Sequence, residues 1–253
     1  MGAYDKVSLA RAKGRLTTVD FIKNIFDGFL EMHGDRRFAD DRSVIAGIGY
    51  LEGTPVTVVG IEKGHNTKEK AFRNFGCAHP EGYRKALRQM KLAEKFKRPV
   101  ICFVDTSGAY CGIGAEERGQ GQAIAENLTE MAALKTPIIS IIIGEGGSGG
   151  ALALAVADTV WMLENAVYSV ISPEGCASIL WNDPGKAKEA SECLKMTAQD
   201  MLRLNIVELI FNEDKNLFEN LKQSLVKTAC ELKNLPDNEL IAGRYKRYRR
   251  IGN

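Results

Sequence analysis

The sequence of 253 residues has little histidine, no closely spaced pair of cysteines and no long apolar run. Its three histidines have no metal-ligand spacing to one another or to a cysteine, so no metal site is expected in this chain alone. The apolar stretches at 137–143 and 151–157 are far shorter than the roughly 18 residues of a membrane-spanning helix. No secretory signal follows the N-terminus, and a cytoplasmic location is therefore expected.

The chain also lacks a strong charge of one sign, because its net charge is only +2. No overall basic field is available to attract nucleic acid. Basic residues do gather at both ends, in residues 1–15 and in a C-terminal group that two tyrosines interrupt: Arg244, Tyr245, Lys246, Arg247, Tyr248, Arg249 and Arg250. We interpret this group as a solvated tail or a docking surface for a partner chain, with nucleic-acid binding as the alternative.

The order of the expected elements is typical of an α/β protein. An amphipathic helix is predicted at 18–33, a β-hairpin at 44–50 and 55–61, a loop at 63–79 and a helix at 80–97. Apolar runs after Pro99 and Pro137 predict two buried strands, and each leads through a glycine-rich loop into a helix, at 117–134 and 149–157. Such strand–loop–helix units indicate a sheet covered by helices.

The rest of the chain is predicted to be mostly helical. Two further strands are expected at 159–163 and 167–171, and Ser172 with Pro173 has the pattern of a helix start. Beyond residue 184 one short strand, at 207–211, interrupts the helices. We therefore expect one domain over 1–253, with a basic segment at about 1–17 and a helical extension at about 212–253. Cys102, within an apolar run, is expected to be a small core residue.

Glycine is the abundant feature, with 25 residues, and it concentrates in two loops at 106–114 and 144–150. A glycine-rich turn between a strand and a helix presents backbone N–H groups that attract negative charge. These groups could stabilise a developing oxyanion in acyl-type chemistry. Alternatively, the glycines could serve only tight turns and close packing between helix and strand.

Two other site types fit the second loop less well. Gly144, Gly146 and Gly149 match a dinucleotide-binding spacing, but two successive loops of this kind are not expected of that fold. No nucleophile elbow of the G-x-S-x-G type is expected. Ser148 could be a nucleophile, yet no histidine follows His79, so we interpret it as a small turn residue. The chain thus has oxyanion donors without an evident base, and the base could come with the substrate.

Several motifs together resemble one family. Residues 108–120, 144–153 and 168–181 are similar to the α subunits of bacterial acetyl-CoA carboxylase carboxyltransferase, and so are the shorter segments 34–36, 39–41, 67–70, 74–76 and 80–87. The resemblance covers about residues 18–211. Ser107 and Cys111 stand where the family has proline, which loosens the first loop without removing any N–H group.

The resemblance implies a crotonase-like (ClpP/crotonase) superhelix of ββα units. It implies transfer of a carboxyl group from carboxybiotin to acetyl-CoA. The carboxybiotin is attached to a biotin carboxyl carrier protein, which is a partner together with biotin carboxylase. The product is malonyl-CoA for fatty-acid synthesis. It also implies a β subunit that carries zinc, an α₂β₂ assembly, and an active site shared between the two subunits.

The same resemblance suggests which backbone groups act. The N–H groups are expected from Gly149 and Gly150 in the second loop and from Gly108 and Gly112 in the first. Neighbouring backbone is expected to contact the biotin group: Ala109, Gly114, Gly146 and Gly147.

Charged residues near the loops have less definite expectations. Glu116, Glu117 and Arg118 could orient the site or cap a helix. For Lys63, Arg84 and Lys85 we expect a solvated face, with contacts to coenzyme A phosphates or to the partner as the alternative. Two further functions stay open: a crotonase-fold acyl-CoA hydratase or decarboxylase that works alone, and a non-catalytic scaffold whose basic tail binds nucleic acid.

Overall fold

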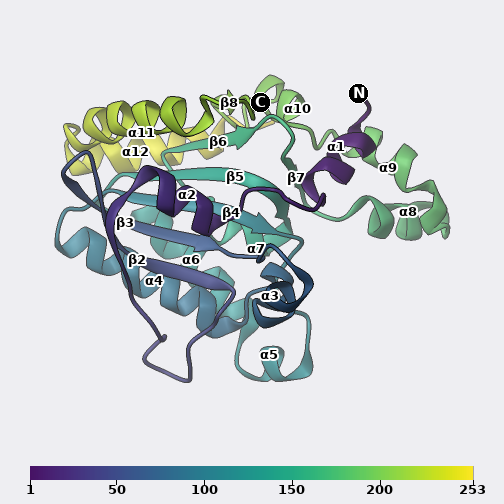
Figure 1. Cartoon of the computed structure of the whole chain (residues 1–253), viewed down its shortest axis with the longest axis horizontal. Coiled ribbons are helices and arrows are strands. Elements are labelled where there is room, and N and C mark those ends of the chain that lie inside the picture. Colours follow the sequence, from purple (N-terminus) through teal and green to yellow (C-terminus); the bar gives the residue numbers. More distant parts are fainter. Residues whose placement is uncertain (253) are drawn as a thin grey trace.

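An eight-stranded sheet forms the centre of the molecule, with strand order β1-β2-β3-β4-β5-β6-β8 and with β7 beside β5 (Figure 1). The computed structural model describes residues 1–252. The strands are β1 (Asp27–Glu31), β2 (Val44–Leu51), β3 (Thr54–Ile61), β4 (Val100–Thr106), β5 (Ile138–Gly147), β6 (Thr159–Leu163), β7 (Val167–Ser169) and β8 (Leu209–Phe211). β1, β2 and β3 pair antiparallel, and every pairing from β3 onward is parallel.

Helices cover both faces of this sheet. They are α1 (Ala3–Ala10), α2 (Thr18–Ile25), α3 (Thr67–Phe72), α4 (Pro80–Lys95), α5 (Ile113–Glu117), α6 (Gln120–Ala133), α7 (Ser148–Leu152), α8 (Pro173–Trp181), α9 (Ala187–Leu194), α10 (Ala198–Arg203), α11 (Leu217–Lys233) and α12 (Asp237–Arg249), with 3-10 turns η1 (Asn74–Gly76) and η2 (Pro184–Lys186). α4 and α6 pack together below the sheet in Figure 1, whereas α1, α8 and α9 project to one side.

Aromatic packing joins α2 and α11 to the sheet. The ring of Phe21 in α2 stacks on Phe103 of β4 at 5.2 Å between centroids and meets Phe218 of α11 edge-on at 5.4 Å. All seven residues of β4 are buried, as expected of a strand covered on both faces. Cys102 lies in this strand, where burial raises the pKa of its thiol to about 12. The prediction that it is a core residue is confirmed.

The predicted hairpin is confirmed as β2 and β3, with Glu52 and Gly53 at positive φ in the turn. The prediction of one helix over 18–33 is wrong beyond Ile25, because the chain turns at Phe26 into β1. Gly28 has a φ of 57°, and β1 pairs with the otherwise free edge of β2. Backbone hydrogen bonds along that edge outweigh the helical spacing of the apolar residues.

Other boundaries also shift for local reasons. The expected loop at 63–79 contains α3, which begins because the Asn66 side chain accepts a hydrogen bond from the Glu69 amide at 3.0 Å. The helix predicted at 117–134 is confirmed as α6, which begins after Gly119, whose φ is 81°, and the first glycine-rich loop leads into the short helix α5 before it. The helix predicted at 149–157 is shorter and ends as α7 at Leu152. Among residues 1–252 no helix is both long and apolar enough to cross a bilayer.

Candidate active site

The two glycine-rich loops lie side by side, as the sequence predicts. β4 ends at Thr106 and β5 ends at Gly147, and Thr106 is paired with Gly146 in the sheet. Both loops therefore leave the sheet at the carboxyl ends of neighbouring parallel strands. This edge is where open α/β sheets commonly bind their ligands.

Close contact between the loops explains two of the glycines. A Cβ atom on Gly147 would lie 2.2 Å from the carbonyl oxygen of Ser107. A Cβ atom on Gly150 would lie 2.6 Å from the amide nitrogen of Ala109 and 2.9 Å from the hydroxyl of Tyr83. At these two positions the packing role holds, because any side chain would force the loops apart.

The amides of the two loops differ in what they already bind. The Gly108 amide donates to Thr106 Oγ1 at 3.0 Å, so it is engaged within its own loop. Gly149 and Gly150 lie in the first turn of α7, where amides have no partner within the helix. A Cβ atom on Gly149 would make only ordinary contact, at 3.6 Å from Ile124. The Gly149 amide is therefore a free donor in an uncrowded position.

Gly149 also lines a cavity of about 400 Å³. The lining is largely apolar: Ser148, Gly149, Leu152, Ala155, Val160, Tyr168, Ser169, Val170, Leu194, Met201, Ile206, Arg247, Tyr248 and Ile251. Gly112 and Gly114 are not among these residues; Gly112 precedes the first turn of α5, and Gly114 lies within it. The structure thus joins the second loop to a cavity, and the first loop supports the second by packing.

Ser148 has a backbone conformation that the sequence analysis did not anticipate. It begins α7 with a φ of 54°, in the left-handed region, although it is not glycine. Residues 146–150 fit the spacing G-x-S-x-G, which marks strained turns from strand to helix in some hydrolases. This spacing is the signal that could have identified Ser148 as more than a small turn residue.

A buried ionic network ties the two loops together. The Lys63 ammonium lies 2.8 Å from Asp105 Oδ1 and 2.7 Å from Glu145 Oε2, and Arg11 contacts Glu145 at 2.8 Å and Glu174 at 2.8 Å. Burial acts to lower the pKa of Lys63, but the two carboxylates outweigh it, so the pKa is raised. The expectation of a solvated face is wrong for Lys63, because its ammonium faces two carboxylates of this chain.

Replacing Lys63 with methionine should destabilise the fold by about 3 kcal/mol, because Asp105 and Glu145 would be left buried with one cation fewer. Urea unfolding followed by circular dichroism measures the loss. Lys63 and Lys70 both line a second cavity, of about 200 Å³. Lys70→Met is the matched control, because Lys70 makes no ion pair within residues 1–252. Equal stability of the two variants would contradict the structural role of the network.

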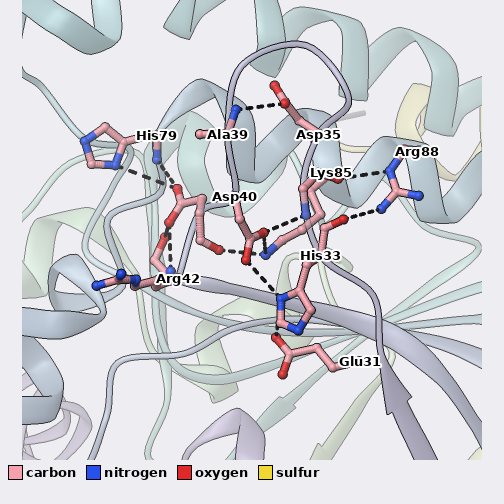
Figure 2. Close-up of polar contacts among 12 residues, drawn as sticks. Glu31, His33, Asp35, Ala39, Asp40, Arg42, His79, Lys85 and Arg88 are labelled. Carbon is pink, nitrogen blue, oxygen red and sulfur yellow. Dashed lines mark hydrogen bonds and ion pairs between the residues drawn. The ribbon is translucent and has the colours of Figure 1, made fainter.

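Lys85 is buried and Arg84 is half-buried in an ion pair, which corrects the expectation that both lie on a solvated face. The Lys85 ammonium donates to Asp40 Oδ1 at 2.6 Å and to the Asp41 carbonyl at 2.7 Å, as Figure 2 shows around His33 and Asp40. Arg84 Nε donates to Asp35 at 2.7 Å. The acidic motifs at 34–36 and 39–41 therefore shape a loop that is held on α4.

Arg118 has a similar structural contact. Its guanidinium donates to Glu81 Oε1 at 2.9 Å, linking the segment between α5 and α6 to the first turn of α4. Glu116 lies in the first turn of α5, a position that favours an acidic side chain. Neither residue lines the cavity beside Gly149. Within residues 1–252 no three His, Cys, Asp or Glu side chains lie together as a metal site would require.

The basic C-terminal group is not a free tail. Arg244 is 1% exposed and donates to Asp158 and to the carbonyls of Met131, Leu134 and Thr136. Arg247 is 5% exposed and contacts Glu208 at 2.8 Å. The interpretation as a solvated tail is wrong for these two residues, which attach α12 to the body of the protein.

Arg244→Ala should cost about 3–5 kcal/mol of the free energy of unfolding, since Asp158 and three carbonyls would lose their donor. The midpoint of urea unfolding reports the change. Lys246→Ala, at an exposed neighbouring position, should stay within about 0.5 kcal/mol of the parent. A stable Arg244→Ala protein would show that α12 is held by other contacts.

The sheet, its paired strand-end loops and the amides at the start of α7 define the fold class. The fold is the mixed α/β, crotonase-like carboxyltransferase fold. The transcarboxylase 12S structure superposes with a TM-score of 0.73 at 18% identity, over 90% of this chain and 44% of that one. At this identity the likeness concerns the fold alone.

Sequence comparison identifies the family. The acetyl co-enzyme A carboxylase carboxyltransferase-like family matches residues 1–252, and the chain belongs to it. It is 62% identical over 256 residues to the carboxyl transferase α subunit of Ruminiclostridium cellulolyticum, covering 100% of this chain and 98% of the relative. A protein of Natranaerobius thermophilus named for subunits β and α is 57% identical over 257 residues, covering 98% of this chain and 42% of its own length.

The chain is thus the carboxyltransferase α subunit of a biotin-dependent acetyl-CoA carboxylase, a transferase. The relative named for both subunits also indicates a β-subunit partner.

Proposed function

We propose that this chain, together with a β subunit, transfers a carboxyl group from biotin on a carrier protein to acetyl-CoA, giving malonyl-CoA. The observation that carries the proposal is the start of α7, where the uncrowded Gly149 amide adjoins a largely apolar cavity. Biotin carboxylase, the carrier protein, an α₂β₂ assembly and a cytoplasmic setting complete the proposal. In it, the zinc belongs to the β subunit.

The cavity fits the uncharged bicyclic ring of biotin. Its volume is about 400 Å³, and the fourteen residues around it include one charged side chain, Arg247, which is held by Glu208. Carboxybiotin supplies an activated carboxyl group, and negative charge develops on its ureido oxygen when that group leaves. An apolar lining excludes water and strengthens any hydrogen bond made to such a charge.

In the proposed reaction the chain contributes hydrogen-bond donors, not a base. The Gly149 amide donates to the developing charge, whereas Gly150, in the same turn, is buried against the first loop and does not line the cavity. The Gly108 amide stays on Thr106. No histidine, lysine or carboxylate is among the described residues that line the cavity. Burial raises the pKa of Tyr168 and Tyr248, so both phenols remain protonated. In this proposal the proton of the acetyl methyl group is therefore accepted by a group that arrives with the substrates.

The experiment is reconstitution of the forward reaction. The chain is purified with the β subunit of the same organism and supplied with carboxylated carrier protein and acetyl-CoA. Mass spectrometry should then detect malonyl-CoA formed by the mixture and not by either subunit alone. Hydration or decarboxylation of acyl-CoA by the isolated chain would instead favour a self-sufficient crotonase-fold enzyme.

The scaffold function with a nucleic-acid-binding tail loses its main support in the structure. Two arginines of the C-terminal group are buried in ion pairs with Asp158 and Glu208, which leaves fewer cations for phosphates. A deletion of residues 237–253 would also remove α12, so it is not a clean test of such a tail.

A further inference from the structure

The strained backbone at Ser148 is the starting point. A left-handed conformation costs a non-glycine residue roughly 1–2 kcal/mol, and glycines occupy the two positions on either side of Ser148. A glycine at 148 would adopt the same turn without that cost. Strained residues that persist cluster at functional sites, so the hydroxyl itself needs an explanation.

The surroundings of Ser148 indicate where its hydroxyl acts. The residue is exposed and lines the cavity next to Gly149. Its hydroxyl makes no hydrogen bond to another group within residues 1–252, whereas Ser169, which lines the same cavity, bonds the Ile171 carbonyl at 2.8 Å. The Ser148 hydroxyl is therefore a donor that is held beside the proposed site of charge development.

A role as nucleophile is disfavoured, although the turn resembles one that presents a nucleophile. A serine nucleophile needs an adjacent base to take its proton. The three histidines are engaged elsewhere: His33 with Asp40, His65 with Asp20 and His79 with Asp41. Arg247, the one charged residue of the lining, cannot act as a base.

We propose that Ser148 is a further catalytic residue, whose hydroxyl donates a hydrogen bond to an anionic oxygen of the carboxyl group in transit, beside the Gly149 amide. This inference rests on the proposed function, since it assigns a residue to that same site. The hydroxyl keeps its own proton throughout and forms no covalent bond. The strain at residue 148 is then the cost of placing a hydroxyl where glycine would fold more easily.

The test compares Ser148→Gly and Ser148→Ala with the control Ser224→Ala, whose hydroxyl bonds the Asn220 carbonyl on α11, in the complex with the β subunit. Malonyl-CoA-dependent carboxylation of biocytin gives kcat, thermal melting gives stability, and calorimetric titration gives the affinity for biocytin. For Ser148→Gly we expect a kcat about 10- to 100-fold lower, as for loss of a hydrogen bond to a charged group. Its melting temperature should equal or exceed the parent value. Biocytin carries no carboxyl group on its ureido ring, so it should bind within twofold of the parent affinity.

Each outcome has a definite meaning. Ser224→Ala, on α11 and outside the cavity, should keep kcat within about threefold, which shows that the effect belongs to Ser148. An unchanged kcat in Ser148→Gly would overturn the role of the hydroxyl while leaving the proposed function intact. An inactive parent complex would overturn the proposed function and this inference with it. A covalent adduct on Ser148 after incubation with malonyl-CoA, seen by intact mass, would overturn the donor role in favour of a nucleophile.

Discussion

Gly149→Val should lower carboxyl transfer by at least about 10²–10³-fold while the protein stays folded. Valine keeps the backbone N–H, but its side chain would keep the substrate away from the amides at the start of α7, and losing the use of one oxyanion donor typically has this effect. The fold should survive because a Cβ atom at this position meets Ile124 at an ordinary 3.6 Å. Carboxylation of biocytin by the complex with the β subunit measures the change.

The matched control for this variant is Gly243→Val in α12. A Cβ atom on Gly243 would have no other atom within 4 Å, and the position is exposed. Its activity should match that of the parent. Normal turnover by Gly149→Val, with a normal melting temperature, would show that the amides of α7 are not the donors.

Gly147→Ala should destabilise the protein by about 3 kcal/mol and remove activity with it. The added Cβ atom would lie 2.2 Å from the Ser107 carbonyl oxygen and 2.4 Å from its carbon, and both are backbone atoms. Neither loop can easily move away, because β4 and β5 are paired up to Thr106 and Gly146. Overpacking of this kind typically costs 1–3 kcal/mol.

Urea unfolding of Gly147→Ala is best compared with Gly149→Ala, two residues further along the same loop. The second variant should stay within about 1 kcal/mol of the parent, since its Cβ atom meets no backbone. If Gly147→Ala were as stable as Gly149→Ala, the loops would not be in the close contact on which the site's geometry depends.

The sequence was most informative where local signals agree. β4 and β5 follow Pro99 and Pro137 and lead into the glycine-rich loops, and the Ser172 side chain caps α8 through the Gly175 amide at 3.1 Å, as expected. Turn and cap chemistry depends on neighbouring residues, so it can be predicted from short segments. The family resemblance added the function, which no spacing or composition could supply.

Elements that depend on distant partners were not predictable in this way. β1 forms because β2 offers an unpaired edge, which local helical spacing cannot reveal. Lys63 is buried because carboxylates on two later strands meet it, and Lys85 because the loop at 39–41 returns to α4. A single charged residue in a sequence carries no sign of such a partner, so solvent exposure was the default expectation.

The positions of the two loops were predicted from the sequence, whereas the role of the Gly149 and Gly150 amides stays a prediction. The sequence could not distinguish glycines needed for packing from those beside a cavity. Only the three-dimensional contacts show that Gly147 and Gly150 touch the first loop and that Gly108 binds Thr106. The expectation that no G-x-S-x-G spacing occurs is wrong, because residues 146–150 have that spacing around Ser148.

The central claim is that this chain supplies one half of a carboxyltransferase site and no base. The most direct measurement is malonyl-CoA-dependent carboxylation of biocytin by a fixed amount of the chain, titrated with the β subunit. The account predicts no activity without the β subunit and a rise that saturates at a one-to-one ratio. Full activity of the chain alone, or none at any ratio of well-folded subunits, would contradict it.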